Sequence, residues 1–181
     1  MAAFTVLDHE EFTSGAAVYS KTGFSTSHDH LLWVLSLRTD GGSTDLDYAG
    51  LRLGTSGSID TGTNYSLQML NGDRVGTPDS SRATGQTAIG NFLVAGTNAE
   101  ADTFGITKIW VPNYANTTGF KQAITQIVHP DNVTTNYYWN SEMDAVLFSE
   151  DTAAIDEVTL YSRVGDFVQY STFTLYGVTG A

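Results

Sequence analysis

The sequence has no cysteine, few charged residues and no long hydrophobic run, and each absence excludes a class of protein. Without cysteine, neither a disulfide framework nor a thiolate metal site can form. Charged residues make up only 15% of the chain, against an average of about 25%. Much of the surface must therefore consist of neutral polar residues, which cost less to desolvate than charges and so suit protein contacts.

Basic residues are the scarcest group, with 8 Lys and Arg against 20 Asp and Glu and a net charge of −12. Binding a duplex requires a footprint of Lys and Arg, so we expect no nucleic-acid partner and no anionic membrane surface. No stretch approaches the ~18 apolar residues that span a bilayer. The first residues lack a basic region followed by an apolar run, so we expect no signal peptide.

The pattern of apolar residues predicts an all-β protein. With 181 residues, of which 41% are hydrophobic, the chain is expected to form one domain over 1–181. We find no window of 11 or more residues with helical apolar spacing, although single helical turns are compatible with 8–12 and 140–144. About ten short alternating runs, separated by turn residues, favour an antiparallel β-sandwich of jelly-roll type, concanavalin-like or viral. The runs cover 31–38, 48–54, 65–70, 87–94, 104–111, 120–128, 137–139, 145–148, 155–161 and 171–178.

Some of these runs are apolar on both sides. In 31–38 one side carries Trp33, while the opposite side begins with Leu32 and Val34 and ends polar, which indicates a central strand partly covered on both sides. Asn71-Gly72 predicts a tight turn. A polar segment at 76–86 shows no strand pattern. Because a strand at a chain end frays unless it is paired, we expect 171–178 to lie within a sheet.

The last 24 residues carry the most specific pattern in the sequence. They resemble the C-terminal end of a group of virion proteins of tailed bacteriophages, which finish in a Gly-Asn/Ser-Phe element and then a Ser-x-Phe-x-Leu-Tyr-Gly-Ile/Val element. The corresponding residues here are Gly165-Asp166-Phe167 and Tyr170-Ser171-x-Phe173-x-Leu175-Tyr176-Gly177-Val178. Further blocks agree over 28–178: His30-Leu31-Leu32, Leu37-Arg38, Leu51-Arg52, Asp60-Thr61-Gly62-Thr63-Asn64-Tyr65 and Pro112-Asn113-Tyr114-Ala115-Asn116-Thr117.

Two departures from that group are visible. Asp166 stands where Asn or Ser is usual, and residues 54–60 lack the usual Asn-Gly. The resemblance implies a jelly-roll accessory protein of a phage particle, often trimeric, with no catalytic residues to carry over.

Three carboxylates within one short segment suggest a calcium site. Asp40, Asp45 and Asp47 supply the hard oxygen ligands that calcium prefers, although their spacing is not that of an EF-hand. Clustering by chance is the alternative in a chain with 20 acidic residues. We otherwise expect no metal and no cofactor.

Four aromatic residues near expected loops are candidates for protein or glycan contacts. Tyr and Trp are enriched at protein interfaces, and their rings also stack on sugars. Burial in the core is the alternative. The four residues are Tyr114, Tyr137, Tyr138 and Trp139.

The motifs typical of enzymes are incomplete. Asp60-Thr61-Gly62 matches the tripeptide of aspartic proteases, but that chemistry needs two such carboxylates, and a loop is favoured. His28 and His30 share one face of a strand but have no third ligand nearby. No Gly-x-Ser-x-Gly elbow occurs. We therefore expect no enzymatic activity.

Together these features predict a non-enzymatic structural protein of a phage virion, made in the cytoplasm of the bacterial host. We expect a homotrimer that binds major capsid or tail proteins, most simply as a capsid decoration protein of the cement or head-protrusion kind. The alternative is a carbohydrate-binding adhesin or receptor-binding domain of a phage tail or fibre, which uses the same architecture.

Overall fold

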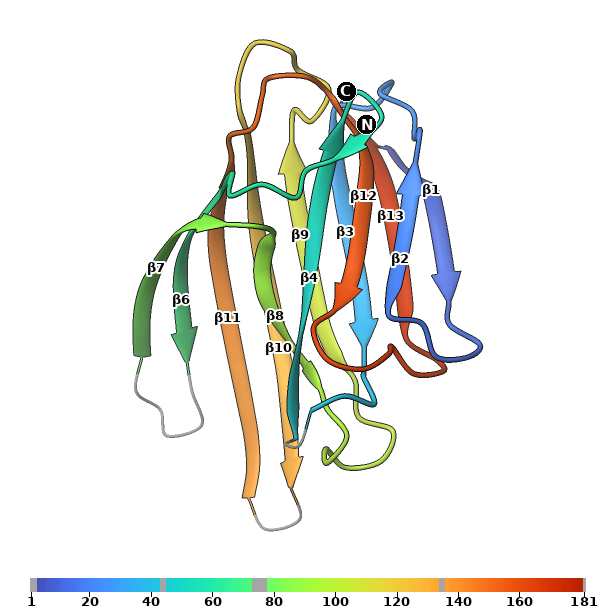
Figure 1. Cartoon of the computed structure of the whole chain (residues 1–181), viewed down its shortest axis with the longest axis vertical. Helices are drawn as coiled ribbons and strands as arrows, with labels where there is room; N and C mark the ends of the chain where they lie inside the picture. The colour runs from blue at the N-terminus through green and yellow to red at the C-terminus, as the bar shows by residue number, and fades with distance from the viewer. Residues whose placement is uncertain (1–2, 43–44, 73–77, 134–135, 181) are drawn as a thin grey trace.

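The structure, a computed structural model, describes residues 3–42, 45–72, 78–133 and 136–180, apart from the side chains of Asn91 and of residues 130–140. The regular secondary structure of these residues is all β (Figure 1), and they include no helix long and apolar enough to cross a membrane. The strands are β1 (Ala3–Glu11), β2 (Val18–Thr22), β3 (His30–Leu37), β4 (Leu46–Thr55), β5 (Ser58–Ile59), β6 (Tyr65–Gly72), β7 (Pro78–Gln86), β8 (Ile89–Ala95), β9 (Gly105–Pro112), β10 (Lys121–Val133), β11 (Asn136–Phe148), β12 (Ile155–Ser162) and β13 (Thr172–Thr179).

Eight of these strands have the pairing order of a jelly roll. The large sheet contains the order β1-β13-β3-β9, and the small sheet contains β2-β12-β4-β8, with every pair antiparallel. When only these eight strands are numbered along the chain, the large sheet has the order 1-8-3-6 and the small sheet has the order 2-7-4-5. This is the order expected when a long antiparallel ribbon rolls up into two facing sheets. The predicted all-β jelly-roll sandwich is therefore confirmed.

Two insertions enlarge mainly the large sheet. The pair β10 and β11 lies between β9 and β12 in sequence, and β5 to β7 lie between β4 and β8. The two-residue strand β5 pairs with β4 in the small sheet, whereas the other inserted strands continue the large sheet beyond β9 in the order β10-β11-β6-β7, giving eight strands in all. In Figure 1 this extension reaches well to one side of the small sheet, with β8 lying across part of it.

The core lies between the two sheets and follows from strand alternation. On β3 the side chains of Leu31, Trp33, Leu35 and Leu37 are all fully buried, while the residues between them are half-exposed. The Tyr65 ring, also fully buried, joins the sheets because its hydroxyl accepts a hydrogen bond from the Leu53 N–H at 2.8 Å. This burial raises the pKa of the Tyr65 phenol.

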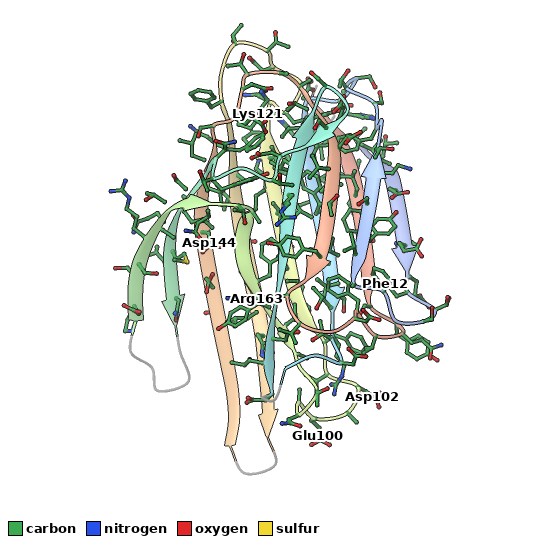
Figure 2. All side chains as sticks on the ribbon, in the orientation of Figure 1. Phe12, Glu100, Asp102, Lys121, Asp144 and Arg163 are labelled. Atoms are coloured by element: carbon green, nitrogen blue, oxygen red, sulfur yellow. The ribbon has the colours of Figure 1, made fainter. Side chains whose placement is uncertain are left out.

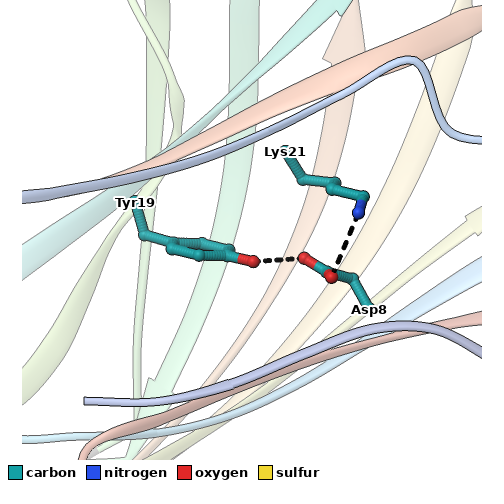
Figure 3. A network of polar contacts seen from close by, with 3 residues as sticks. All are labelled: Asp8, Tyr19 and Lys21. Atoms are coloured by element: carbon teal, nitrogen blue, oxygen red, sulfur yellow. Dashed lines mark hydrogen bonds and ion pairs between the residues drawn. The ribbon is translucent and has the colours of Figure 1, made fainter. Parts of the chain in front are cut away.

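The edge strands of the two sheets are joined by a polar network (Figure 3). The Tyr19 hydroxyl on β2 donates to the Asp8 carboxylate on β1, and the Lys21 ammonium lies 3.2 Å from the same carboxylate. Burial, together with the hydrogen bond to Asp8, raises the pKa of Tyr19. This network links the two sheets at an edge where neither β1 nor β2 has a fully buried residue.

The strand at the C-terminal end is paired on both sides, as predicted. β13 lies between β1 and β3, and Phe173 and Leu175 are fully buried. However, β12 and β13 belong to different sheets, so the Gly165-Asp166 region does not close a hairpin. It crosses the end of the sandwich instead, where Gly165 has φ +74° and a side chain there would meet the Asp40 carboxylate.

Several local predictions were wrong. The polar segment 76–86 contributes strand β7, and Asn71-Gly72 are paired with Asp79 and Pro78 rather than forming a turn. Backbone pairing of β10 continues through Pro130 to Val133. The residues considered for helical turns, 8–12 and 140–144, lie largely in β1 and β11. In each case pairing with a neighbouring strand decides the local conformation.

We predict that Leu175→Ala lowers the free energy of unfolding by about 2–5 kcal/mol, because it leaves a cavity between the sheets. Thr174→Ala, on the outward side of the same strand, is the matched control and should cost less than about 1 kcal/mol. Urea unfolding followed by tryptophan fluorescence measures both values. Equal losses for the two variants would show that β13 does not face the core as described.

Candidate interaction surface

The outer face of the small sheet is polar and locally covered. Its outward positions include Ser20 on β2 and Thr159 on β12, whose hydroxyls are hydrogen-bonded at 2.7 Å. The Tyr161 ring lies over Gly50, and the Arg52 guanidinium lies 4.5 Å from the centre of that ring. This is the usual outer face of an antiparallel sandwich, in which one side of each sheet is solvated.

The outer face of the large sheet is different, because its outward positions are mostly apolar. Along β9 and β10 the buried residues alternate with exposed ones, and the exposed ones include Ile106, Ile124 and Val128. Six aliphatic or thioether side chains on this side are between 37% and 57% exposed: Leu70, Ile106, Ile124, Val128, Met143 and Leu147. We call the outward side of β13, β3, β9, β10, β11 and β6 the apolar face.

The strand register brings these residues into continuous rows. One row crosses the sheet from Tyr176 on β13 to Leu32, Trp110, Ile124 and Ala145. Directly opposed side chains on neighbouring strands lie ~4.5–5.5 Å apart at their Cβ atoms, so each row forms a continuous surface. The apolar side chains therefore form one patch and are not scattered singly over the surface.

Charge is nearly absent from the apolar face. None of its described outward positions carries Asp or Glu, although the chain has 20 acidic residues. Among these described positions, Lys108 on β9 is the one charged side chain. The other ionisable groups there are the His30 imidazole and the Tyr176 phenol. Depletion of charge with retention of large apolar side chains is the composition of the centre of a protein interface.

The face is hollowed in two adjacent places. A groove of about 690 Å³ is lined by Leu70, Ile106, Val128 and Met143, with Gly72 and Pro78 at its β6–β7 end. Asp79 and Glu142 also border it, from positions that alternate toward the other side of the sheet. A second hollow of about 480 Å³ includes Ile124, Leu147 and Arg82.

A ring pair lies beside these hollows. The centres of the His30 and Trp110 rings are 4.9 Å apart, and Trp110 lines a third hollow together with Phe4 and Ile124. Phe4, on the edge strand β1, meets Tyr176 edge-on at 6.4 Å. Aromatic side chains thus border the apolar face on the β1 side.

On the inner side of the extension, a partly buried and a fully buried carboxyl group lie together beneath β8. Glu142 and Asp144 are two residues apart on β11 and point the same way (Figure 2 labels Asp144). Asp144 is fully buried and accepts a hydrogen bond from the Thr125 hydroxyl at 2.8 Å. Burial, and secondarily the charge of Asp144, raises the pKa of Glu142 to about 8, so the pair retains a proton at neutral pH.

We predict a pH dependence of stability from this pair. Glu142 has a higher pKa in the folded protein than in the unfolded chain, so the folded state binds more protons between about pH 4.5 and about pH 8. The free energy of unfolding should therefore fall as pH rises through that range. Glu142→Gln removes this dependence, and its stability relative to the wild type should increase with pH in chemical unfolding. Parallel curves for the two proteins would contradict the assignment.

The three candidate calcium ligands are not brought together. The Asp47 carboxylate is buried and accepts a hydrogen bond from the Thr39 hydroxyl at 2.7 Å, whereas Asp40 accepts one from the Asp166 N–H at 2.7 Å. Asp45 contributes its carbonyl oxygen to the Gly96 N–H. Within the described ranges, no three His, Asp or Glu side chains are placed to hold a metal ion. These aspartates stabilise loops at one end of the sandwich.

The aromatic candidates have different outcomes. Tyr114 is fully buried, and its hydroxyl donates to the Ser25 carbonyl at 2.5 Å, so its ring is not available to a glycan or a partner. The backbones of Tyr137, Tyr138 and Trp139 pair with β10, but their side chains lie outside the described residues. Their predicted role in contacts stays a prediction.

The remaining motifs have local structural roles. The Asp60 carboxylate accepts hydrogen bonds from the Gly62 N–H at 2.7 Å and the Asn64 side chain at 3.1 Å, which confirms a loop. His28 contacts the Thr179 hydroxyl, and His30 accepts from the Asn113 N–H at 3.1 Å. The imidazole of His28 packs over Gly177.

Sequence reasoning did not identify the apolar face as a site. The signal was present, because the runs at 31–38 and 104–111 are apolar on both sides. Such a pattern indicates a strand with two covered faces. The sequence does not reveal that other segments of the chain pack against only one of these two faces.

Comparisons with known proteins identify no family for this chain. No protein-family model matches the sequence, and no curated protein matches it. Among solved structures, the CBM2 module of the evolved Dit of Lactobacillus casei BL23 phage J-1 has a TM-score of 0.27 at 9% identity, over 91% of this chain and 69% of that one.

Two further solved structures are more distant. Infectious bursal disease virus, Gx strain, gives a TM-score of 0.19 at 18% identity over 98% of this chain and 39% of that one. The sugar-binding C-terminal domain of EclA gives a TM-score of 0.17 at 9% identity, over 99% of this chain and 76% of that one. The chain thus spans well under half of the viral protein. Scores this far below 0.5 carry no argument about fold or function, and the fold assignment rests on the strand pairing alone.

Proposed function

We propose that this protein is a non-enzymatic structural component of a bacteriophage particle that binds other virion proteins. The observation that carries the proposal is the apolar face: a broad, charge-poor surface of large side chains on a rigid sheet. Monomeric proteins rarely expose contiguous apolar patches of this kind unless they bind something. The resemblance of the closing residues to tailed-phage virion proteins supplies the phage context.

One feature of the structure supports this proposal. The resembling segment Phe173–Val178 lies in β13, which pairs on both sides within the jelly-roll half of the large sheet, so the similarity lies in the part that organises the fold. We favour a capsid decoration protein assembled as a homotrimer, located in the virion after synthesis in the host cytoplasm.

The direct test uses phage particles produced without this protein. Purified protein added to empty capsids should sediment with them and saturate at a fixed number of copies per particle. Binding to isolated tails and not to capsids would indicate that the protein is a component of the tail. Protein that stays in the supernatant with both preparations would contradict a structural role in the virion.

The net charge of −12 gives a second prediction. Copies of the chain repel one another, and salt screens this repulsion with a Debye length of about 10 Å at 0.1 M. Self-association measured by sedimentation velocity should therefore strengthen between low and moderate NaCl concentration. A monomer at every ionic strength would contradict assembly as a homo-oligomer.

A carbohydrate-binding adhesin is the second candidate, and one observation favours it. Trp110 lies on the apolar face beside Gln126 and Lys108, and an aromatic ring flanked by an amide and an ammonium group, both hydrogen-bond donors, is suited to a sugar. Binding on a glycan array that disappears with Trp110→Ala would support this function. If Trp139→Ala abolished binding instead, the site would lie at the β10–β11 end. An array without any signal would exclude it.

A further inference from the structure

The acidic residues of this chain are unevenly distributed over its surface. The outward positions of the six strands of the apolar face carry no described carboxylate, while the whole chain has a net charge of −12. Two copies that approach through surfaces carrying carboxylates bring like charges together. Two copies that approach through this face do not, and Lys108 can extend its ammonium group toward solvent along its flexible stem. Charge therefore favours this face for contact between copies.

The face also has the shape that contact between copies requires. A surface that meets its own copy must supply both the protruding groups and the hollows that receive them. Leu70, Ile106 and Ile124 are each about half-exposed and stand beside hollows of about 690 and 480 Å³. Phe4 is 60% exposed and stands at the β1 margin of the same sheet. Protruding side chains and hollows thus lie on one continuous surface.

The available area is sufficient. The six strands of the apolar face at ~4.8 Å spacing, each with about four outward residues, cover about 24 Å by about 23 Å; with the flanking outward sides of β1 and β7, the outer face of the large sheet reaches about 34 Å by about 23 Å, or roughly 780 Å². A standard protein interface buries about 800 Å² on each partner. The outer face of the large sheet therefore matches the size of a stable contact between two proteins. The outer face of the small sheet, by contrast, is polar and partly covered by its own Tyr161 ring.

We propose that copies of this chain bind one another through the apolar face. Ile124, on β10 near the middle of the sheet, lies in the contact and is removed from solvent by it. This inference rests on the proposed function in one respect, since it names the surface by which the virion component assembles.

The experiment compares three single variants of the full chain by sedimentation equilibrium. Ile124→Glu places a carboxylate in the contact, and Ile124→Thr removes apolar surface without adding charge while retaining a β-branched side chain. Ser20→Glu adds the same charge to the outer face of the small sheet and is the matched control. Circular dichroism verifies that each variant retains its β-structure, which is expected because both positions point outward.

The wild type should form a reversible oligomer. Its dissociation constant should rise by about tenfold or more for Ile124→Glu, because a carboxylate would be desolvated without a partner, and by less for Ile124→Thr. Ser20→Glu should change it by less than about threefold, the effect of one added exposed charge. An oligomer weakened equally by Ser20→Glu and Ile124→Glu would overturn the inference, as would a wild type that stays monomeric.

This outcome is separable from that of the proposed function. Sedimentation with capsids is scored on particles, whereas self-association is scored on the purified chain alone. A monomer that still saturates capsids would overturn the inference and leave the virion role intact. An oligomer that binds neither capsids nor tails would support the inference and contradict the virion role.

Discussion

The structure depends on the alternation of side chains across a single eight-stranded sheet that is apolar on both sides. On one side, Trp33, Ile109 and Ile127 are buried against the small sheet and β8. On the other, Trp110, Ile124 and Met143 face outward at the positions between them. Because one sheet carries both sets, the same pleat that builds the core also creates the surface by which we propose that the protein assembles.

The two insertions explain why the second surface is so broad. A jelly roll alone would present four strands on each side, but β10, β11, β6 and β7 double the width of one sheet, while the other gains only the two-residue strand β5. The inner side of these four strands is partly covered by β8 and contains the carboxyl pair of Glu142 and Asp144. Their outer side supplies most of the hollowed surface. The extension thus gives a standard fold a large contact area without a separate domain.

Much of the core could be predicted from the sequence. Trp33, Leu175 and Leu160 belong to runs with clear period-two alternation, and all three are buried. The strand β7 could not be predicted, because its residues Pro78–Gln86 are exposed on both sides and owe their conformation to pairing with β6. The sequence also does not predict which sheet each strand joins. For example, β12 and β13 are consecutive in the chain but lie in opposite sheets.

The candidate site was less predictable than the core. Tyr114 and Asp47 were expected at a surface, but a hydroxyl or carboxylate can be buried wherever a backbone or side-chain partner satisfies it, as Ser25 and Thr39 do here. Sequence patterns do not report such partners, because they come from distant segments. Ile124 and Met143 were overlooked for the opposite reason, since apolar residues in strands are ordinarily assigned to the core.

The most direct test of this account is photochemical carbene labelling of the protein at concentrations below and above self-association. If the outer face of the large sheet joins the copies, peptides that contain Ile106–Trp110 and Ile124–Val128 should be labelled in the dissociated chain and protected in the assembled one. Peptides from β2 and β12 should be labelled equally in both. Unchanged labelling of the β9 and β10 peptides on assembly would contradict the account.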